Sequence, residues 1–445
     1  MTGTRRETGW STILETELTL RDQSRDRYVQ VPFTLPVDAE SFEVRIEVQD
    51  PPGAQGPALV DLGCEGPAGW RGWSGGARRD FVIAADDASP GYVPGPLEVG
   101  RWAVVLGLHS LPSQRAGIRV QLRTPAATRP DHGPRIAPCR GVRRGSARKL
   151  PAPPGRRWLA GDTHCHSLHS DGSRSLWQVA HEAVRSGLDF LCVTEHNTVS
   201  HHAWLPGVGA EHGITLVPGQ EVTTHRGHAN AYGDIGVIDF RQDVETWARE
   251  AAARGGLLSI NHPVSGDCSW IEPVPDLVGG IEALHADLFR DPLSTAAVGW
   301  AAQMLASRRE RGLPIPSLLA GADFHSPDVP IRPGTPTTWV CVEENSPEGI
   351  IAAMAEGRTT LTTSYCLDEE GAGRPQLMDC PILVRSGAAA DEETLHVLAA
   401  GGHVLVDSAG RRQVIESPDE VRSAPRGAGP YRLETPDRRT VALSS

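Results

Sequence analysis

The sequence lacks long apolar runs. No segment approaches the roughly 20 consecutive apolar residues that a membrane-spanning helix requires, so we expect no membrane segment. The N-terminal stretch from Met1 to Glu7 carries basic side chains without the apolar run that follows them in a secretion signal. Cytoplasmic residence is therefore the expected location.

Paired cysteines and a net positive charge are also missing. The eight cysteines occur singly, with no C-x-x-C pair, which argues against structural zinc sites and thioredoxin-like redox centres of that spacing. The formal net charge of −12 argues against a surface that coats nucleic acid, and we expect no stable nucleic-acid binding. No phosphate-cradling loop of the P-loop type is present.

The chain of 445 residues has room for two or three domains. Residues 1–125 contain segments that alternate apolar and polar side chains, such as 41–49 and 117–123, and this period of two predicts a small antiparallel β-sandwich. Residues 126–156, rich in Pro, Arg and Gly, are predicted to be a linker or a wrapping segment. Residues 366–445 are Gly-rich and predict a small β-rich C-terminal extension.

Residues 157–365 have a different pattern, in which short apolar runs alternate with helical segments. Helices are predicted at 175–186, 243–254 and 347–356. Seven strands are predicted, at 157–163, 188–194, 214–219, 257–261, 280–284, 317–322 and 336–343. Buried strands separated by helices favour an α/β barrel, open or closed.

Chemically reactive side chains follow the predicted strands. They are His164 and His166; Glu195 and His196; Glu221; His262; His285 and Asp287; and Asp323 and His325. The C-terminal ends of barrel strands meet on one face, so these residues should be neighbours. Imidazole and carboxylate together suit zinc, manganese or iron, and their number exceeds the four ligands of a structural tetrahedral site. The pattern therefore predicts more than one divalent ion.

Each motif alone has an ordinary explanation. His164 and His166 could be satisfied histidines at a strand end, Asp171 could belong to a turn, and Asp323 with His325 could be a surface pair. Their joint occurrence on consecutive strand ends favours the metal site.

Five segments resemble, in order, the motifs of the PHP (polymerase and histidinol phosphatase) superfamily. They are Asp162-Thr163-His164-Cys165-His166 with Asp171-Gly172, residues 187–198, residues 218–221 with Gly227-His228, residues 260–263 and residues 321–326. The resemblance covers about 158–365 and implies a distorted seven-stranded β/α barrel with a dinuclear or trinuclear site, commonly of manganese, zinc or iron. The Asn197-Thr198 pair, the segment 227–230 and the N-terminal β-domain look most like the branch that includes carbaryl hydrolase.

The resemblance also implies a role for each metal-binding position. His164, His166, Asp323 and His325 resemble the ligands of one ion, with Glu221 as a bridge. Asp171 with His196 resembles the set for a neighbouring ion, and His228 with His262 resembles the set for a third. His225 is the alternative to His228, and Glu195 stands where the superfamily usually has Asp.

Four residues are candidates for catalysis. Asp323 could accept a proton from the attacking water as well as bind metal, and Glu195 could form hydrogen bonds or reach a metal. His201 could face substrate or begin an exposed helix, and Arg290 could hold a phosphate in a bidentate manner or be a surface residue.

These features predict a metal-dependent hydrolase that acts on a small-molecule substrate. The leading hypothesis is hydrolysis of a phosphoester, so that the substrate is phosphorylated. The alternative is hydrolysis of a carbamate, ester or amide by the same site. A hypothesis of another class is a non-catalytic metal-binding recognition module.

Overall fold

The computed structural model describes residues 9–54, 56–112, 114–328, 330–386, 392–425 and 429–444. The segment expected to lack a secretion signal therefore lies outside the described residues. The chain forms two compact units. The first comprises Met1–Gly133, Leu168–Gly172 and His196–His201, and the second comprises Pro134–Ser167, Ser173–Glu195 and His202–Ser445. Within the described residues, no helix has both the length and the apolar character needed to cross a bilayer.

The first unit contains two four-stranded antiparallel sheets with strand orders β1-β8-β3-β6 and β2-β7-β4-β5. The period-two pattern of 41–49 explains this packing, because Phe42, Val44 and Ile46 are all buried in the common core. The elements are β1 (Ser11–Leu18), α1 (Leu20–Arg25), β2 (Tyr28–Phe33), β3 (Ser41–Gln49), β4 (Leu59–Gly66), β5 (Gly69–Gly75), β6 (Asp80–Ala84), β7 (Trp102–Ser110) and β8 (Ala116–Arg123).

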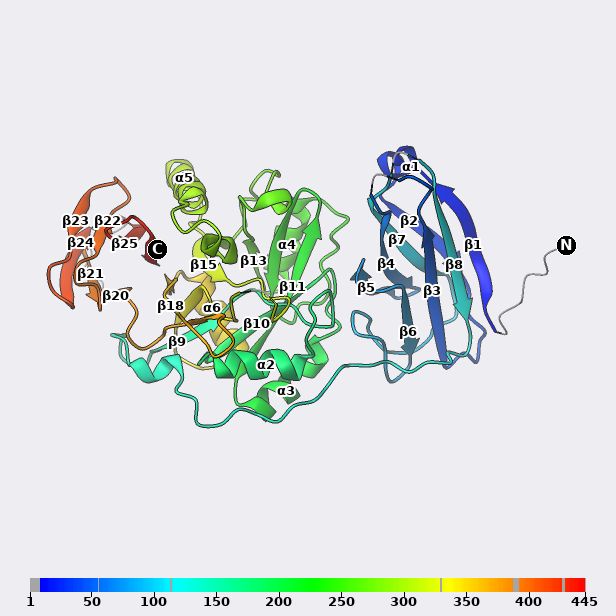
Figure 1. Ribbon diagram of the computed structural model, residues 1–445, viewed down its shortest axis with the longest axis horizontal. Helices are drawn as coiled ribbons and strands as arrows, with labels where there is room; N and C mark the ends of the chain where they lie inside the picture. The colour runs from blue at the N-terminus through cyan, green and yellow to red at the C-terminus, as the bar shows by residue number, and fades with distance from the viewer. Residues whose placement is uncertain are drawn as a thin grey trace. The chain divides into compact units, whose positions relative to one another are not determined.

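The second unit is built on one large sheet with strand order β15-β14-β13-β12-β11-β10-β9-β16-β17-β26-β25-β22-β23. The seven predicted strands correspond to β9 (Arg157–Asp162), β10 (Phe190–His196), β11 (Thr215–Thr224), β13 (Leu257–Ile260), β14 (Gly280–His285), β15 (Ser317–Gly321) and β16 (Thr337–Val342). The unit is thus a mixed α/β fold, and helices border the sheet (Figure 1).

The expectation of seven strands in a mainly parallel barrel needs correction. An additional strand, β12 (Gly227–Tyr232), lies between β11 and β13 and is antiparallel to both. The last predicted strand, β16, is also antiparallel to its neighbour β9. The segment 227–232 contains Gly, His and Asn and has little intrinsic strand preference, so its pairing comes from the two flanking strands.

Within the described residues, backbone hydrogen bonds between strands do not close this sheet into a barrel. Side-chain hydrogen bonds connect β15 to β16 instead. The hydroxyl of Thr338 accepts a hydrogen bond from the backbone N–H of Ala320 (2.7 Å) and donates one to the carbonyl of the same residue (2.8 Å). The Thr359 hydroxyl donates to the carbonyl of Leu318 (2.9 Å). The Thr338 hydroxyl thus satisfies the backbone N–H and carbonyl of Ala320, which a neighbouring strand would otherwise have paired.

The predicted helices begin at capping residues. Ser175 forms a capping box with Gln178, and the side chains of Asp243 and Ser346 each accept a hydrogen bond from the first turn of their helix. The helices are α2 (Leu176–Arg185), α3 (Leu205–His212), α4 (Val244–Ala253), α5 (Ala296–Arg311) and α6 (Pro347–Ala355). Short 3-10 turns occur at Gly145–Arg148, His202–Trp204, Gly266–Cys268 and Ala286–Phe289.

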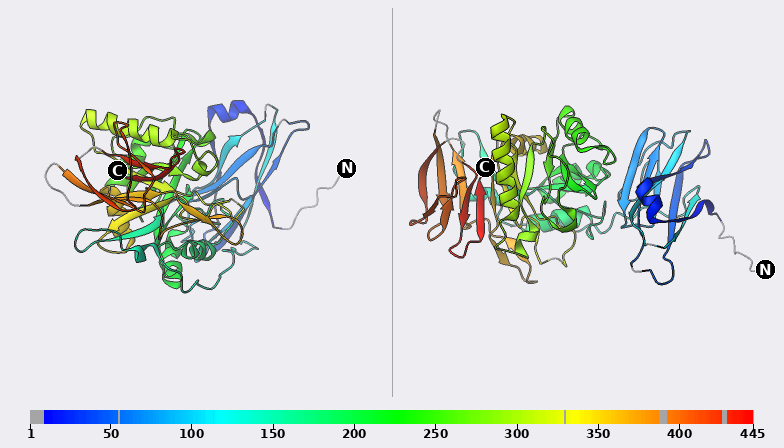
Figure 2. Two further views of the ribbon diagram at one scale, coloured as in Figure 1. Left: turned by 60° about the vertical axis from the view of Figure 1, so that its left-hand side comes forward. Right: turned by 90° about the horizontal axis from the view of Figure 1, so that it is seen from above.

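The C-terminal strands continue the main sheet and add smaller ones. Strand β26 pairs with β17, and β20, β21 and β24 form a three-stranded sheet. Figure 2 shows these orange-to-red strands beside α5. The elements are β17 (Thr359–Thr362), β18 (Tyr365–Leu367), β19 (Gly373–Pro375), β20 (Ile382–Ser386), β21 (Glu392–Leu398), β22 (Val404–Val406), β23 (Arg412–Val414), β24 (Glu420–Pro425), β25 (Tyr431–Glu434) and β26 (Thr440–Ser444).

The segment predicted as a linker packs along the second unit. Ser146 donates from its backbone and its hydroxyl to Asp189, and Arg148 donates to the carbonyls of Leu377 and Cys380. These hydrogen bonds connect Ser146 and Arg148 to the rest of the second unit.

Candidate metal centre

Four side chains from the second unit converge to form what we call the metal centre: His164, His166, Glu221 and Asp323. Their nearest nitrogen and oxygen atoms all lie within 4.8 Å of one another. Nε2 of His164 and Nε2 of His166 are 3.1 Å apart, and Asp323 Oδ1 lies 3.1 Å from the first and 3.0 Å from the second. Both histidines are fully buried. Imidazole nitrogens and carboxylate oxygens that lie this close together can act as ligands of one shared cation.

The segments that follow β9 and β15 run side by side and align these residues. The backbone N–H of His166 donates to the carbonyl of Phe324 (3.0 Å), and that of Asp323 donates to the carbonyl of His164 (3.0 Å). Extended residues alternate between two faces. Cys165 and Phe324 consequently enter the apolar core, while the polar residues on either side of them face the metal centre.

Two residues of the site have a backbone conformation that L-amino acids rarely adopt. Asp323 has φ of 51° and His262 has φ of 24°. Such conformations cost free energy and persist where the surrounding structure fixes them, commonly at functional sites. The backbone is therefore fixed at the two positions where strands β15 and β13 give way to the loops that carry these side chains.

Glu221, on β11, connects the metal centre to a second group of histidines. Its Oε1 accepts a hydrogen bond from Asn261 (2.8 Å) and lies 3.2 Å from both His228 Nδ1 and His262 Nε2. The pairing of Glu221 with Asn230 between β11 and β12 brings His228 to this position. His228 therefore lies in the site, whereas the alternative residue His225 is exposed.

The sequence analysis missed Glu282, a buried carboxylate on β14. Its Oε1 lies 3.2 Å from His164 Nδ1, and its Oε2 accepts the backbone N–H of His262 (2.8 Å). Gly321 allows this approach, since a Cβ at that position would lie 2.3 Å from Glu282 Oε1 and 2.4 Å from His164 Cβ. Glu282 thereby orients a predicted metal ligand through the ring nitrogen on its far side.

Asp162 is a second carboxylate whose contribution was not predicted. It accepts backbone hydrogen bonds from His164 (3.1 Å), Ala322 (3.0 Å) and Gly334 (2.7 Å). Burial raises the pKa of Asp162 to about 6 in spite of these three bonds. The side chain fixes the ends of β9 and β15 relative to each other.

The charges of the site shift the pKa values of its members in opposite directions. Burial alone would lower the pKa of His164 and raise that of Asp323. The carboxylates around His164 instead raise its pKa well above the ordinary value, and the histidines around Asp323 hold its pKa well below. His285, whose Nε2 lies 3.3 Å from Asp323 Oδ2, has its pKa raised to about 10 by Asp287 and Asp323 against the effect of burial.

Three predicted residues fall in the first unit. His196 Nε2 lies 3.5 Å from Asp171 Oδ1, a separation suited to two ligands of one ion. The buried ring of His201 packs edge-on against His169, with 6.0 Å between centroids. The roles assigned to these residues stay predictions.

The loops that carry these residues are bound to the sandwich within the first unit. Arg78 donates to the carbonyl of Leu168 (2.6 Å), and Trp70 Nε1 donates to that of Asn197 (3.1 Å). The Thr198 hydroxyl donates to the carbonyl of Gly91 (2.7 Å), whose own N–H donates to the Ser200 hydroxyl (3.0 Å). The sandwich thus holds the backbone that precedes Asp171 and the backbone that follows His196.

The other candidates have different surroundings. His325 stacks on His166 with 4.1 Å between ring centroids. Glu195 is buried, and its two oxygens lie 3.0 and 3.2 Å from the backbone nitrogen of Ser167, which favours a role in fixing the turn after His166. Arg290 is 83% exposed and pairs with Asp287 (3.1 Å). Their catalytic assignments stay predictions.

No family model matches the sequence. A curated relative, a 5'-3' exoribonuclease from Haemophilus influenzae, is 34% identical over 64 residues, which make up 14% of this chain and 23% of the relative. The chain thus matches less than a quarter of that relative's length.

Two solved structures show partial similarity. A two-domain protein from Bacteroides vulgatus with a predicted PHP-like metal-dependent phosphoesterase domain has a TM-score of 0.40 at 19% identity, covering 70% of this chain and 99% of that one. An amidohydrolase from Chromobacterium violaceum has a TM-score of 0.27 at 16% identity, covering 37% of this chain and 87% of that one. Both scores are too low to establish a shared fold, so the resemblance to the PHP superfamily and to its carbaryl-hydrolase branch stays a prediction.

Proposed function

We propose that the chain is a metal-dependent hydrolase that acts on phosphoesters. The observation that carries the proposal is the convergence of two buried imidazoles and two carboxylates in the metal centre. Within the described residues, the buried Asp323 Oδ1 forms no hydrogen bond although it lies about 3 Å from two histidine nitrogens. A buried carboxylate oxygen without a hydrogen bond is costly, and a divalent cation would satisfy it. The donor set therefore fits manganese, zinc or iron.

The residues of the metal centre and its neighbours would have the following roles. His164, His166 and Asp323 would hold one ion, and Glu221 would bridge to another held by His228 and His262. Divalent ions bound there would supply Lewis acidity and lower the pKa of a water molecule. Asp323 would accept a proton from that water molecule, and its Oδ2 lies 3.3 Å from His285 Nε2. His285 would return a proton to the leaving group.

Phosphoester hydrolysis is our first choice of substrate class. The curated relative with the short matching stretch is named as an exoribonuclease, an activity on phosphodiesters. Hydrolysis of a carbamate, ester or amide is the second candidate. One observation favours it, because Arg290, the side chain predicted to hold a phosphate, is mostly exposed and paired with Asp287.

A hydrolysis screen tests the proposal. Wild-type protein loaded with manganese, zinc or iron is assayed on phosphomonoesters, phosphodiesters, aryl carbamates and aryl esters. We expect turnover of a phosphoester and competitive inhibition by inorganic phosphate, which raises KM without changing kcat. Turnover of a carbamate or ester alone, together with indifference to millimolar phosphate, would favour the second candidate.

The His166→Ala variant links that activity to the metal centre. Changing groups behind metal ligands already costs about 10- to 100-fold, so deletion of a ligand should lower kcat/KM at least about 100-fold. The control is His181→Ala, which removes a half-buried histidine that contacts the carbonyl of Ala137. A wild-type rate and metal content in His166→Ala would exclude the site. Metal binding without turnover of any substrate would identify a recognition module instead.

A further inference from the structure

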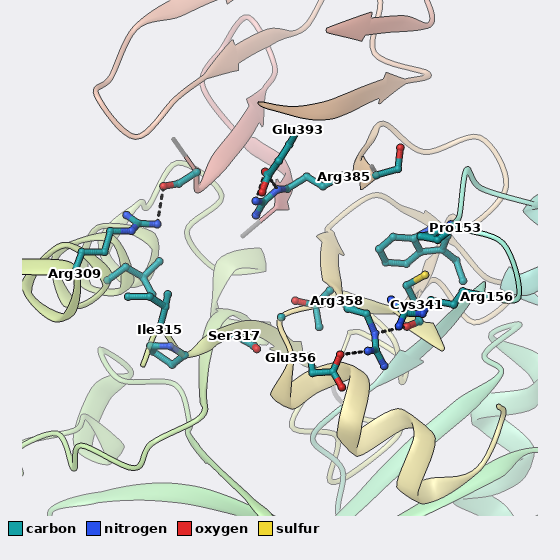
Figure 3. Close-up of a pocket in the computed structure, with 17 residues that line it drawn as sticks. Pro153, Arg156, Arg309, Ile315, Ser317, Cys341, Glu356, Arg358, Arg385 and Glu393 are labelled. Carbon is teal, nitrogen blue, oxygen red and sulfur yellow. Dashed lines mark hydrogen bonds and ion pairs between the residues drawn. The ribbon is translucent and has the colours of Figure 1, made fainter. Parts of the chain in front are cut away.

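The second unit contains a pocket of about 740 Å³. The first residues of β9, β15 and β17 lie at this pocket, together with the end of α5 and with strands β20 and β21. Figure 3 shows side chains from these separate elements directed toward one space. We call it the arginine pocket.

The charge of the pocket has the opposite sign to that of the protein. Its lining includes Arg156, Arg309, Arg358 and Arg385 against two glutamates, Glu356 and Glu393, whereas the whole chain has a formal charge of −12. A local excess of positive charge on an acidic protein attracts anions.

Arg309 carries the least compensated of these charges. Its guanidinium donates to the backbone carbonyl of Gly429 (3.0 Å), and within the described residues it forms no ion pair. Arg358, 17% exposed, donates through Nε to the carbonyl of Cys341 (2.9 Å) and pairs with Glu356, which is 59% exposed. Because Glu356 is mostly in solvent, it can turn away and leave the Arg358 fork for an anionic ligand.

Apolar side chains line the pocket next to these cations. Ile315 is 42% exposed and projects beside Arg309 (Figure 3). Leu305 and the indole of Trp158 also contribute to the lining. An exposed branched apolar residue beside an uncompensated guanidinium offers contacts to a ligand that is apolar at one end and charged at the other.

We propose that the arginine pocket binds a small organic anion, with a carboxylate, phosphate or sulfonate head and an apolar or aromatic body. Arg309 would hold the head, and Ile315 beside it would contact the body. The volume lies within the range of about 300–1,000 Å³ that is usual for small-molecule sites.

This site is separate from the metal centre. The pocket lies near the beginning of β9 and β15, at Trp158 and Ser317, whereas His164, His166 and Asp323 of the metal centre follow the ends of the same two strands. The six residues from Trp158 to His164 span about 20 Å when extended. The proposal therefore does not depend on the hydrolase function.

Two dyes that share an aromatic body test the proposal on the full-length protein. Anilinonaphthalenesulfonate carries a sulfonate, and N-phenylnaphthylamine does not. Fluorescence titration should show saturable binding of the charged dye at about one equivalent, and weaker binding of the neutral dye. The Arg309→Gln variant should weaken binding of the charged dye about tenfold, the cost of one hydrogen bond to a charged group, and leave the neutral dye unaffected. Ile315→Ser should weaken both.

Matched variants locate the dye. Arg311→Gln changes an arginine on the same helical turn that pairs with Asp276 instead of lining the pocket, and it should bind like wild type. His166→Ala should also bind like wild type. Unchanged affinity for the charged dye in both Arg309→Gln and Ile315→Ser would overturn the proposal, as would equal affinity of the wild type for the two dyes. Loss of binding in His166→Ala would assign the dye to the metal centre and have the same consequence.

Discussion

Glu282 is a single side chain that connects two segments of the metal centre. It contacts the ring of His164 and the backbone of His262 at the same time, and it is 2% exposed. A carboxylate behind a histidine ligand fixes the tautomer and the direction of the ring, and raises its basicity toward a metal. The negative charge, and not merely the shape, should therefore matter.

We expect Glu282→Gln to weaken binding of manganese or zinc by about 10- to 100-fold. Calorimetric titration measures the affinity, and thermal unfolding of the metal-free protein checks the fold. Any fall in the metal-free melting temperature measures the stability that the buried carboxylate contributes through His164, and it is separate from the loss of metal affinity. Glu344→Gln, a change at an exposed position, is the control. Wild-type metal affinity in Glu282→Gln would show that the carboxylate has no positioning role.

The predicted metal ligands were easier to find in the sequence than the carboxylates behind them. His164 and Asp323 follow apolar runs directly, so the sequence places them at strand ends. Glu282 stands inside an apolar run, where an acidic residue normally indicates the solvent face of a strand. Only the structure shows that both faces of β14 are covered at this point.

At the scale of elements, the hairpin of β18 and β19 fixes the loop that follows His325. Asp368, in its turn, accepts hydrogen bonds from Arg332 (3.0 Å) and Arg374 (3.0 Å) and from two backbone N–H groups. Burial would raise the pKa of Asp368, but these donors hold it well below its usual range. Arg332 is itself 2% exposed, so the pair is buried on both sides.

Asp368→Asn should destabilise the protein by about 3 kcal/mol at neutral pH, because it removes a buried carboxylate that two guanidiniums share and leaves Arg332 paired with the mostly exposed Glu370. Because the pKa of Asp368 is lower in the folded protein than its value of about 3.9 in the unfolded chain, its carboxylate stabilises the fold at pH values above about 3.9. This stability is lost as the pH falls toward the folded pKa. The difference between variant and wild type should therefore shrink below about pH 4. Urea unfolding at pH 7 and pH 3 measures it. Asp437→Asn, at an exposed pair, is the control, and a difference that stays constant with pH would contradict the assignment.

The strands differ in how well the sequence predicts them. Seven strands of the second unit coincide with apolar runs because both of their faces are buried. Strand β12 has the sequence Gly-His-Ala-Asn-Ala-Tyr, which offers no such run, and its ladders with β11 and β13 supply its stability. The short strand β22 also depends on β25, a partner distant in sequence, and local patterns do not record such pairings.

At the scale of the whole molecule, the N-terminal sandwich supports residues that lie far along the chain. Gly91 illustrates how close the contact is, since a Cβ there would lie 2.8 Å from the carbonyl oxygen of Trp73 and 3.2 Å from that of His169. The loops 168–172 and 196–201 belong to the same compact unit as the sandwich. The sandwich therefore stabilises the backbone that carries Asp171 and His196.

We expect Arg78→Ala to weaken binding of the ion assigned to Asp171 and His196 by about tenfold, the cost of one hydrogen bond from a charged donor. The ion assigned to His164 and His166 should be retained. Metal analysis during stepwise chelation measures the two separately. Arg79→Ala is the matched control, because Arg79 donates to the carbonyl of Val60 inside the sandwich. Equal metal retention by the two variants would show that the contact with Leu168 does not support the site.

The pairing of β17 with β26 has a consequence for how the chain can be shortened. Thr360, Leu361 and Thr362 form their ladder with residues 442–444, close to the end of the chain. Removal of the C-terminal strands would leave β17 as an open edge, with a row of backbone donors and acceptors exposed to solvent. Such an edge is a template on which other chains add as strands. Strand β26 therefore protects the edge of β17, and a chain cut before residue 440 would be prone to self-association before it lost its fold.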